Sequence, residues 1–240
     1  MKFKIGAPYF FWIFIMPKNK RMGECIYCRK FGEITDDHIP PTNLFPKPKP
    51  SNLITVPSCK KCNSESSKDD EYFRMVISMR HDTFEHPEVI KNRHKILRSF
   101  QRPNKKGLLN LLAKNLSTVD LYSQGGIYLG KTGACNVDMK RVNAVIKRIT
   151  LGLFYKEKGR GLPDSYLPYV YCISDVKKLL QNPVKEILAS TFQGKVISIG
   201  NEIFKYWYKT VSDEENCISL ILSFYNRVNF FAFTLPKEKL

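Results

Sequence analysis

The stretch TDDHIPPTNLF, residues 35–45, places two acids and a histidine directly before two prolines. A carboxylate can hold a metal ion and an imidazole can take a proton from water, so Asp37 and His38 suit metal-assisted hydrolysis. On a regular strand, however, neighbouring side chains point to opposite faces. Pro40 and Pro41 restrict the backbone around them, and we therefore expect them to help end a strand so that the two groups converge.

Two CxxC pairs flank this stretch, with Cys25 and Cys28 in CIYC and Cys59 and Cys62 in CKKC. This spacing lets one tight turn present two thiolates to a single ion, and four thiolates make a closed tetrahedral site for Zn²⁺. A redox role is the alternative, but no thioredoxin-like βαβ pattern lies nearby, and a structural zinc is favoured. Because four sulfur ligands leave no open position, this zinc is not expected to be the catalytic metal.

The number and grouping of the cysteines indicate the redox environment of the protein. The chain has seven cysteines, and Cys135, Cys172 and Cys217 are too scattered to form a second metal site. An odd count with four cysteines grouped in two pairs argues against a disulfide scaffold. A reducing environment suits such a chain, and we expect a cytoplasmic location.

The order CxxC, DHIPP, Asn-Leu and CxxCN between Cys25 and Glu71 resembles the HNH endonucleases. The match is to the zinc-knuckle, ββα-metal branch that has Asn at the last motif position, and it covers under a quarter of the chain. The resemblance implies a β-hairpin followed by a helix, with a divalent ion clasped between them and a four-cysteine zinc site bracing the base. The fold expected for the whole chain is therefore α+β, with this module followed by a helical region and a C-terminal antiparallel sheet.

The resemblance also implies a role for each motif residue. His38 takes the position of the general base, and Asp37 and Asn63 take the positions of the ligands of the catalytic ion. Asn52 takes the position of the middle motif residue, whose role is mainly to fix the loop that carries the base, and we count it with His38 as catalytic. Carboxylate and amide oxygens suit Mg²⁺ or Mn²⁺ better than zinc, and so small a ligand set leaves room for phosphate and water.

The charge balance points to a polyanionic partner. Lys and Arg number 39 against 22 Asp and Glu, which gives a formal net charge of +17. Nucleic acid is the first candidate, and an anionic membrane surface is a weaker one because no long basic amphipathic helix is evident. Lys60, Lys61 and Lys68, beside the motif, are candidates for phosphate contacts, although a solvated charged turn explains them nearly as well.

The rest of the chain gives a coarser picture. An uncharged aromatic run from Ile5 to Met16 is too short to span a bilayer, which takes about 20 apolar residues, and we do not expect stable membrane insertion. It is interpreted as a packed extension or as sequence before a later start at Met16 or Met22, with secretion less favoured. Beyond Glu71 the pattern predicts a mostly helical stretch over 71–115, broken at His86-Pro87 and at Pro103. It then predicts a hairpin around Gly125-Gly126, an amphipathic helix with a basic face from Lys140 to Leu153, and an antiparallel sheet over 194–236.

These observations predict an N-terminal extension (1–22), an HNH nuclease module (23–80) and an α+β region (81–240) that positions the substrate. The predicted activity is metal-dependent hydrolysis of DNA phosphodiester bonds, with structural Zn²⁺ and catalytic Mg²⁺ or Mn²⁺. One site cuts one strand, so duplex cleavage needs a homodimer or two encounters. The alternatives are a zinc-knuckle protein that binds DNA or RNA without cutting it, and an RNA-cleaving HNH toxin.

Overall fold

The computed structural model describes residues 20–100, 116–123, 125–173, 184–211 and 214–239. The apolar run from Ile5 to Met16 lies outside the described residues, and so does the helix break expected at Pro103. No helix in the described ranges is long and apolar enough to cross a membrane.

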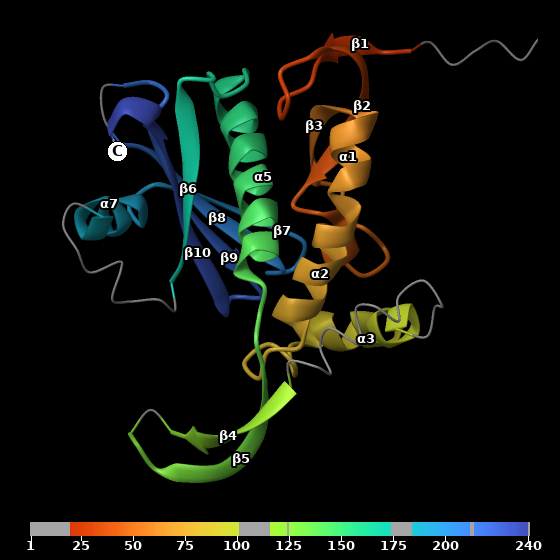
Figure 1. Cartoon of the computed structure of the whole chain (residues 1–240), viewed down its shortest axis with the longest axis vertical. Helices are drawn as coiled ribbons and strands as arrows, with labels where there is room; N and C mark the ends of the chain where they lie inside the picture. The colour runs from red at the N-terminus through yellow and green to blue at the C-terminus, as the bar shows by residue number, and fades with distance from the viewer. Residues whose placement is uncertain (1–19, 101–115, 124, 174–183, 212–213, 240) are drawn as a thin grey trace, which may run out of the picture.

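The N-terminal unit is a small antiparallel sheet followed by two helices (Figure 1). Its strands, in the spatial order β1-β2-β3, are β1 (Met22–Glu24), β2 (Phe31–Ile39) and β3 (Ile54–Cys59), and a short 3-10 helix, Thr42–Leu44, lies between β2 and β3. Helices α1 (Lys60–Glu65) and α2 (Ser67–Ser78) follow directly. This hairpin-then-helix order is compatible with the expected ββα module.

A helix and a two-stranded ribbon follow the N-terminal unit. Helix α3 (Pro87–Phe100) begins at the proline that was expected to break the helical stretch. Strands β4 (Leu116–Tyr122) and β5 (Tyr128–Cys135) pair antiparallel, which confirms the hairpin expected around Gly125-Gly126. The ribbon stands away from the rest of the molecule in Figure 1.

Helix α5 (Met139–Lys158) connects the two halves of the molecule. The Asp138 side chain caps its N-terminus, and Gly159, with φ of 70°, ends it in the left-handed conformation that glycine adopts easily. The helix contacts α2, β2 and β3 on one side and β6 and β10 of the C-terminal sheet on the other. A Cβ built on Gly152 would lie 2.5 Å from the Ile39 side chain, so only glycine lets α5 approach β2 this closely.

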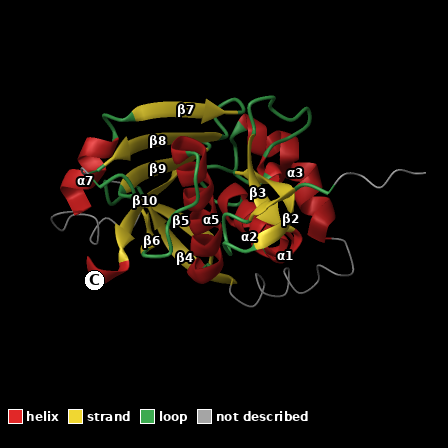
Figure 2. Ribbon diagram, turned by 90° about the horizontal axis from the view of Figure 1, so that it is seen from above, coloured by secondary structure: helices red, strands yellow, loops and turns green. Residues whose placement is uncertain are grey.

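The C-terminal sheet has the order β6-β10-β9-β8-β7, and all neighbours in it are antiparallel. Its elements in chain order are β6 (Tyr166–Cys172), α7 (Val184–Thr191), β7 (Lys195–Ile199), β8 (Phe204–Thr210), β9 (Ile218–Phe224), β10 (Val228–Pro236) and a 3-10 turn, Lys237–Lys239. Helix α7 packs against β8 and β9, and α5 packs against β6 and β10 (Figure 2). Separate apolar clusters on the two faces bury β9 along its whole length.

One buried apolar cluster joins the N-terminal unit to this sheet. It contains Ile39 from β2, Phe73 from α2, Ile146 from α5 and Phe224 from β9. The rings of Phe73 and Phe224 meet edge to face, with their centroids 5.0 Å apart. The core therefore crosses the sequence boundary expected near residue 80, and α5 holds the N-terminal hairpin against the larger sheet.

Candidate functional site

Four cysteines from the two CxxC pairs come together beside β3 and α1. The Sγ atoms of Cys25, Cys28, Cys59 and Cys62 all lie within 4.8 Å of one another, and those of Cys28 and Cys59 are 3.8 Å apart. Zn–S bonds of about 2.3 Å in a tetrahedron place sulfurs about 3.8 Å apart, so the spacing matches such a site. The group could hold a structural metal such as zinc, and the pairing inferred from the two motifs is confirmed.

The local backbone explains how the cysteines meet. Arg29, with φ of 60°, closes the first turn, and the Cys25 N–H donates to the Lys30 carbonyl at 3.0 Å. The Ile26 N–H donates to the Pro57 carbonyl at 3.1 Å, which attaches this turn to β3. Cys59 ends β3 and caps α1, its Sγ accepting from the Cys62 N–H at 3.5 Å. A filled site would therefore fix the junction at which β3 becomes α1.

Two of the four thiols, those of Cys25 and Cys62, have strongly shifted pKa values. Burial raises the pKa of Cys25, but hydrogen bonds from the backbone N–H groups of Cys28, Cys59 and Tyr27 outweigh it and lower the pKa to about 6. Burial and hydrogen bonds with Cys59 and Cys28 raise the pKa of Cys62. One thiolate is thus favoured among its neighbours before any metal binds, and metal binding would release the remaining protons.

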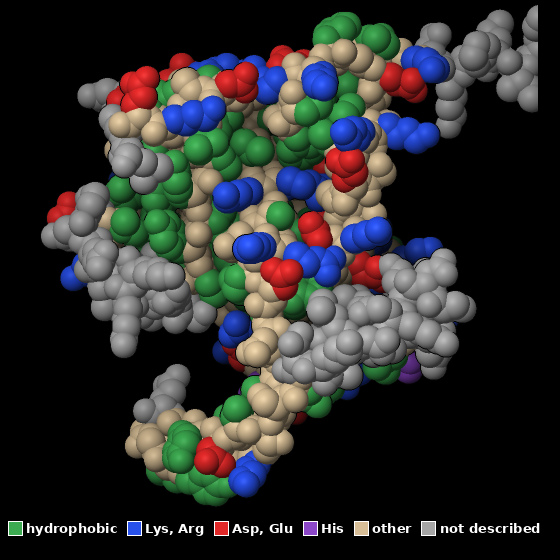
Figure 3. Space-filling model, viewed as in Figure 1, with side chains coloured by type: hydrophobic (Ala, Val, Ile, Leu, Met, Phe, Trp, Pro, Cys, Tyr) green, Lys and Arg blue, Asp and Glu red, His purple; other side chains and the backbone are tan. Residues whose placement is uncertain are grey.

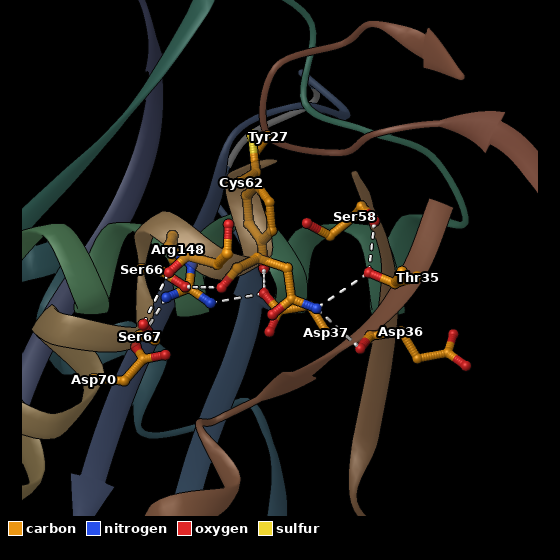
Figure 4. Close-up of polar contacts among 12 residues, drawn as sticks. Tyr27, Thr35, Asp36, Asp37, Ser58, Cys62, Ser66, Ser67, Asp70 and Arg148 are labelled. Atoms are coloured by element: carbon orange, nitrogen blue, oxygen red, sulfur yellow. Dashed lines mark hydrogen bonds and ion pairs between the residues drawn. The ribbon is translucent and has the colours of Figure 1, made fainter. Parts of the chain in front are cut away.

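The second cluster lies around Asp37, on the face of β2 that α5 covers. Asp37 is 6% exposed, and its Oδ2 accepts from the Tyr27 hydroxyl and from Arg148 Nη2, each at 2.7 Å. The other arm of the guanidinium, Nη1, donates to Asp70 Oδ1 at 2.8 Å. Figure 4 shows the Arg148 guanidinium between the two carboxylates, with Tyr27 reaching down from the cysteine turn.

This cluster has two carboxylates, Asp37 and Asp70, and one guanidinium, that of Arg148. Burial raises the pKa of Asp70 to about 6, because the charge of Asp37 adds to the burial and Arg148 only partly offsets both. The pKa of Tyr27 is raised by burial and by Asp37. Burial alone would lower the pKa of Arg148, but Asp70 and Asp37 raise it. With both acids ionised the formal charge of the cluster is −1, which favours an added cation.

Asn63 lies on α1 against the same part of β2. Its Nδ2 donates to Thr35 Oγ1 at 3.1 Å and to the Asp36 carbonyl at 3.3 Å, across 27 positions of sequence. Both amide hydrogens are therefore used, and Asn63 Oδ1 and Asp37 Oδ1 are without a hydrogen-bond partner among the described residues. These are the two oxygens that the resemblance assigns to the catalytic ion, and carboxylate and amide oxygens are donor types that suit Mg²⁺ or Mn²⁺.

His38 does not share a face with Asp37. Strand β2 ends at Ile39, directly before Pro40, as expected, but its pairing with β3 is continuous from Asp37 (opposite Val56) through His38 (opposite Thr55) to Ile39. The two side chains therefore leave opposite faces, and the convergence expected from strand termination is not seen, because the ladder preserves the pleat through both residues. His38 is half-buried and makes no side-chain hydrogen bond or ion pair within the described ranges.

One edge of β2 is open beside Asp37 and His38. Strand β1 pairs only with residues 31–33 of β2, so the later residues of β2 have no strand on that side. Asn63 reaches the same edge through the Asp36 carbonyl.

The other predicted residues lie outside the cluster. Asn52 is exposed, and its Nδ2 donates to the Ser198 carbonyl of β7 at 3.1 Å, so it links the β2–β3 connection to the C-terminal sheet. Its described hydrogen bond does not reach the segment that carries His38. Lys60, Lys61 and Lys68 are all exposed on α1 and α2, with Lys61 4.0 Å from Glu65.

Sequence reasoning missed three members of the Asp37 cluster: Tyr27, Asp70 and Arg148. Asp69 and Asp70 lie in the first turn of α2, where the helix dipole alone would favour acids. Both also form ion pairs with α5, Asp69 with Arg141 at 2.6 Å and Asp70 with Arg148. The available signal was the spacing, since Arg141 and Arg148 lie two turns apart on one face of α5.

Two cavities differ in their relation to this cluster. One of about 640 Å³ is lined mostly by apolar side chains of α2, β5 and β10, among them Met75, Cys135 and Phe230. A smaller hollow of about 220 Å³ lies between α1, α2 and α5 and is bordered by Cys62, Asp69 and Arg148. The small hollow, and not the apolar cavity, borders the Asp37 cluster, through Arg148.

The arrangement of these residues is the basis on which function must be argued for this chain. Comparisons with protein families, with curated proteins and with solved structures found no match.

Proposed function

We propose that this protein is a metal-dependent endonuclease that hydrolyses DNA phosphodiester bonds at the open edge of β2. The observation that carries the proposal is that Asn63 of α1 bonds to Thr35 and Asp36, the two residues of β2 directly before Asp37. Residues of β2 and α1 are joined there across 27 sequence positions, and the side chains of Asn63 and Asp37 each keep one oxygen free of other described partners. The four-cysteine group next to them braces the strand–helix junction that brings them together.

The roles follow from the placement of the side chains. Asp37 Oδ1 and Asn63 Oδ1 would hold Mg²⁺ or Mn²⁺, which when bound supplies charge stabilisation at the phosphoryl and leaving oxygens. The Tyr27 hydroxyl and Arg148 hold Asp37 Oδ2 and so direct the other carboxylate oxygen. His38 approaches from the opposite face and takes the proton from water. A neutral imidazole is a common general base for activating water.

The surface around the site suits a polyanion. Lys and Arg side chains lie along the face made by α5 and by α1–α2, with a few acids among them (Figure 3). Lys140 and Lys147 are exposed along α5, and Lys60, Lys61 and Lys68 are exposed across the small hollow from them. We assign these lysines to phosphate contacts along the backbone of the bound nucleic acid.

Cleavage of supercoiled plasmid with Mg²⁺ or Mn²⁺ tests the proposal. The wild-type protein is expected to relax or linearise the plasmid, and His38→Ala and Asn63→Ala are expected to lower the rate by a factor of about 10² to 10⁴. His94→Ala, which changes an exposed histidine of α3, is the matched control and should cut at the wild-type rate. Plasmid that stays supercoiled with every protein would overturn the proposal.

The same assay separates the related activities. Appearance of nicked circles before linear plasmid indicates independent cuts, whereas linear product from the start indicates a homodimer that cuts both strands. Single-stranded RNA tested in parallel distinguishes an RNA-cleaving toxin from a DNA endonuclease.

A non-catalytic zinc-braced protein that binds nucleic acid is the second candidate. The observation in its favour is that Asp37 already has a cationic partner in Arg148, while His38 leaves β2 on the other face. This candidate predicts salt-sensitive binding of the plasmid without cleavage, equal in the wild type and in His38→Ala.

A further inference from the structure

We propose that Arg148 is a positioning residue that occupies the cation's place beside Asp37 and sets the affinity of that carboxylate for a divalent ion. The inference rests on the proposed metal site, because it concerns how the site is loaded. It assigns a role to a residue of α5 that lies 111 positions from Asp37 and outside the motif region.

The guanidinium has one anchoring arm and one arm on the candidate metal ligand. Nη1 donates to Asp70 at 2.8 Å and Nη2 donates to Asp37 at 2.7 Å. Loss of the Asp37 contact therefore leaves Arg148 held at Asp70. The freed Nη2 remains at the site, where it can donate to a phosphate oxygen.

The cluster is buried enough for these charges to interact strongly. The side chains of Asp37, Arg148 and Asp70 are 8%, 16% and 15% exposed. Arg148 Nε is buried with no hydrogen-bond partner among the described residues, so the carboxylates are the hydrogen-bonding anchors of the guanidinium. The Tyr27 ring supports it from one side, 5.4 Å from its central carbon. At this burial an added or removed charge is only weakly screened.

There is space beside the guanidinium into which Nη2 could move when a divalent ion binds to Asp37. The hollow of about 220 Å³ borders Arg148 directly, and its other walls include Ser66, Asp69 and Ala144. Asp69 is already held by Arg141 at 2.6 Å, so it does not offer a released Nη2 an uncommitted carboxylate.

Because of this arrangement, two substitutions should change the affinity for divalent ions in opposite directions. Arg148→Met removes the resident cation and leaves two carboxylates, so divalent ions should bind more tightly. Asp70→Asn leaves the guanidinium with Asp37 as its one carboxylate partner in the cluster, so divalent ions should bind more weakly. Loss of structure alone would move both variants in the same direction, since both break the same ion-pair network.

The test is titration of the full-length, zinc-loaded protein with Mn²⁺, with free Mn²⁺ followed by electron paramagnetic resonance. We expect Arg148→Met to lower the Mn²⁺ dissociation constant about tenfold and Asp70→Asn to raise it about tenfold. This size follows because one buried opposite charge beside a carboxylate changes its cation affinity by tenfold or more. Arg141→Met and Asp69→Asn make the same charge changes in the neighbouring ion pair and should stay within about twofold of wild type.

Opposite shifts in the first two variants, with little change in the controls, support the inference. Shifts in one direction, no shifts, or equal shifts in the controls overturn it. If Arg148→Met fails to fold, Asp70→Asn decides alone, since unchanged or tighter binding contradicts the proposal. Plasmid cleavage by the same proteins is scored separately: opposite shifts without cleavage sink the nuclease assignment only, and cleavage without the shifts sinks this inference only.

Discussion

The cysteine group and the Asp37 cluster are neighbouring parts of the N-terminal unit that differ in their chemistry. Four sulfurs surround one point, and a metal there would have no open position. Two carboxylates share one guanidinium, and Asp37 keeps an oxygen without a described partner. Tyr27 links the two clusters, because it lies between Cys25 and Cys28 and donates to Asp37.

The two clusters therefore suit different roles. A metal held by four sulfurs has no open position for a substrate, so it would contribute to folding. The carboxylate cluster carries a formal charge of −1 when both acids are ionised, and in our proposal its guanidinium leaves Asp37 when a divalent ion binds. The proposal thus assigns rigidity to the sulfur site and ligand exchange to the carboxylate cluster.

The largest effect is expected from removing one cysteine of the four-sulfur site. Cys62→Ser should abolish zinc binding and lower the melting temperature by roughly 10 °C or more, because structural zinc contributes several kcal/mol to folding. Zinc content measured by atomic absorption and melting followed by circular dichroism check this. Cys135→Ser, outside the group, should keep the metal; zinc retained by Cys62→Ser would contradict the four-sulfur site.

The next largest effect is expected at Arg148. Without added Mg²⁺ or Mn²⁺, Arg148→Met should lower the free energy of unfolding by about 3 kcal/mol, because it leaves buried carboxylates unpaired. Arg141→Met breaks a more exposed pair, whose side chains are 26% and 34% exposed, and should cost about 1 kcal/mol or less. Urea unfolding measures both. Equal losses would mean that the Asp37 cluster is no more tightly coupled than its neighbour.

Stability should also depend on pH through Asp70. Its pKa is raised to about 6 from an ordinary value of 3.8, so between these pH values the folded protein binds more protons than the unfolded chain. The free energy of unfolding contributed by this group therefore falls as pH rises from about 4 to 6 and is constant above that range. Asp70→Asn should flatten this part of the urea-derived profile, and Arg148→Met should extend the fall to higher pH, because Arg148 lowers the pKa of Asp70. An unchanged profile in Asp70→Asn would count against the assigned pKa.

The smallest effects are expected at the exposed lysines. Lys60→Ala, Lys61→Ala and Lys68→Ala should each weaken DNA binding uniformly across sequences and reduce the slope of log affinity against log salt by about one. Fluorescence anisotropy at several salt concentrations measures this. Lys237→Ala, at the far end of the chain, should leave the slope unchanged, and a similar change there would indicate nonspecific charge attraction.

The parts of the fold that follow from local pattern were predictable from sequence. The CxxC spacing predicted the sulfur group, Gly125-Gly126 marked the turn of the β4–β5 ribbon, and the apolar spacing from Val142 to Leu153 marked the buried face of α5. These signals are short-range, because each depends on residues within one turn, one hairpin or one helix face.

Long-range contacts were not predictable in the same way. The pairing of Arg148 with Asp37 depends on how α5 packs against β2, which Gly152 permits through its close approach to Ile39. The opposite facing of Asp37 and His38 depends on how far the ladder with β3 extends, which the prolines alone did not fix. The hydrogen bond from Asn52 to Ser198 likewise requires knowledge of where β7 lies.

The central claim is that Asp37 and Asn63 share one divalent ion while the four sulfurs hold another. Anomalous diffraction from Mn²⁺-soaked crystals, recorded on both sides of the manganese and zinc edges, tests it directly. We predict a zinc peak among the sulfurs and a manganese peak about 2.2 Å from one oxygen each of Asp37 and Asn63, with Arg148 Nη2 withdrawn from Asp37. A zinc peak alone, with Arg148 still bound to Asp37 at saturating Mn²⁺, would contradict the account.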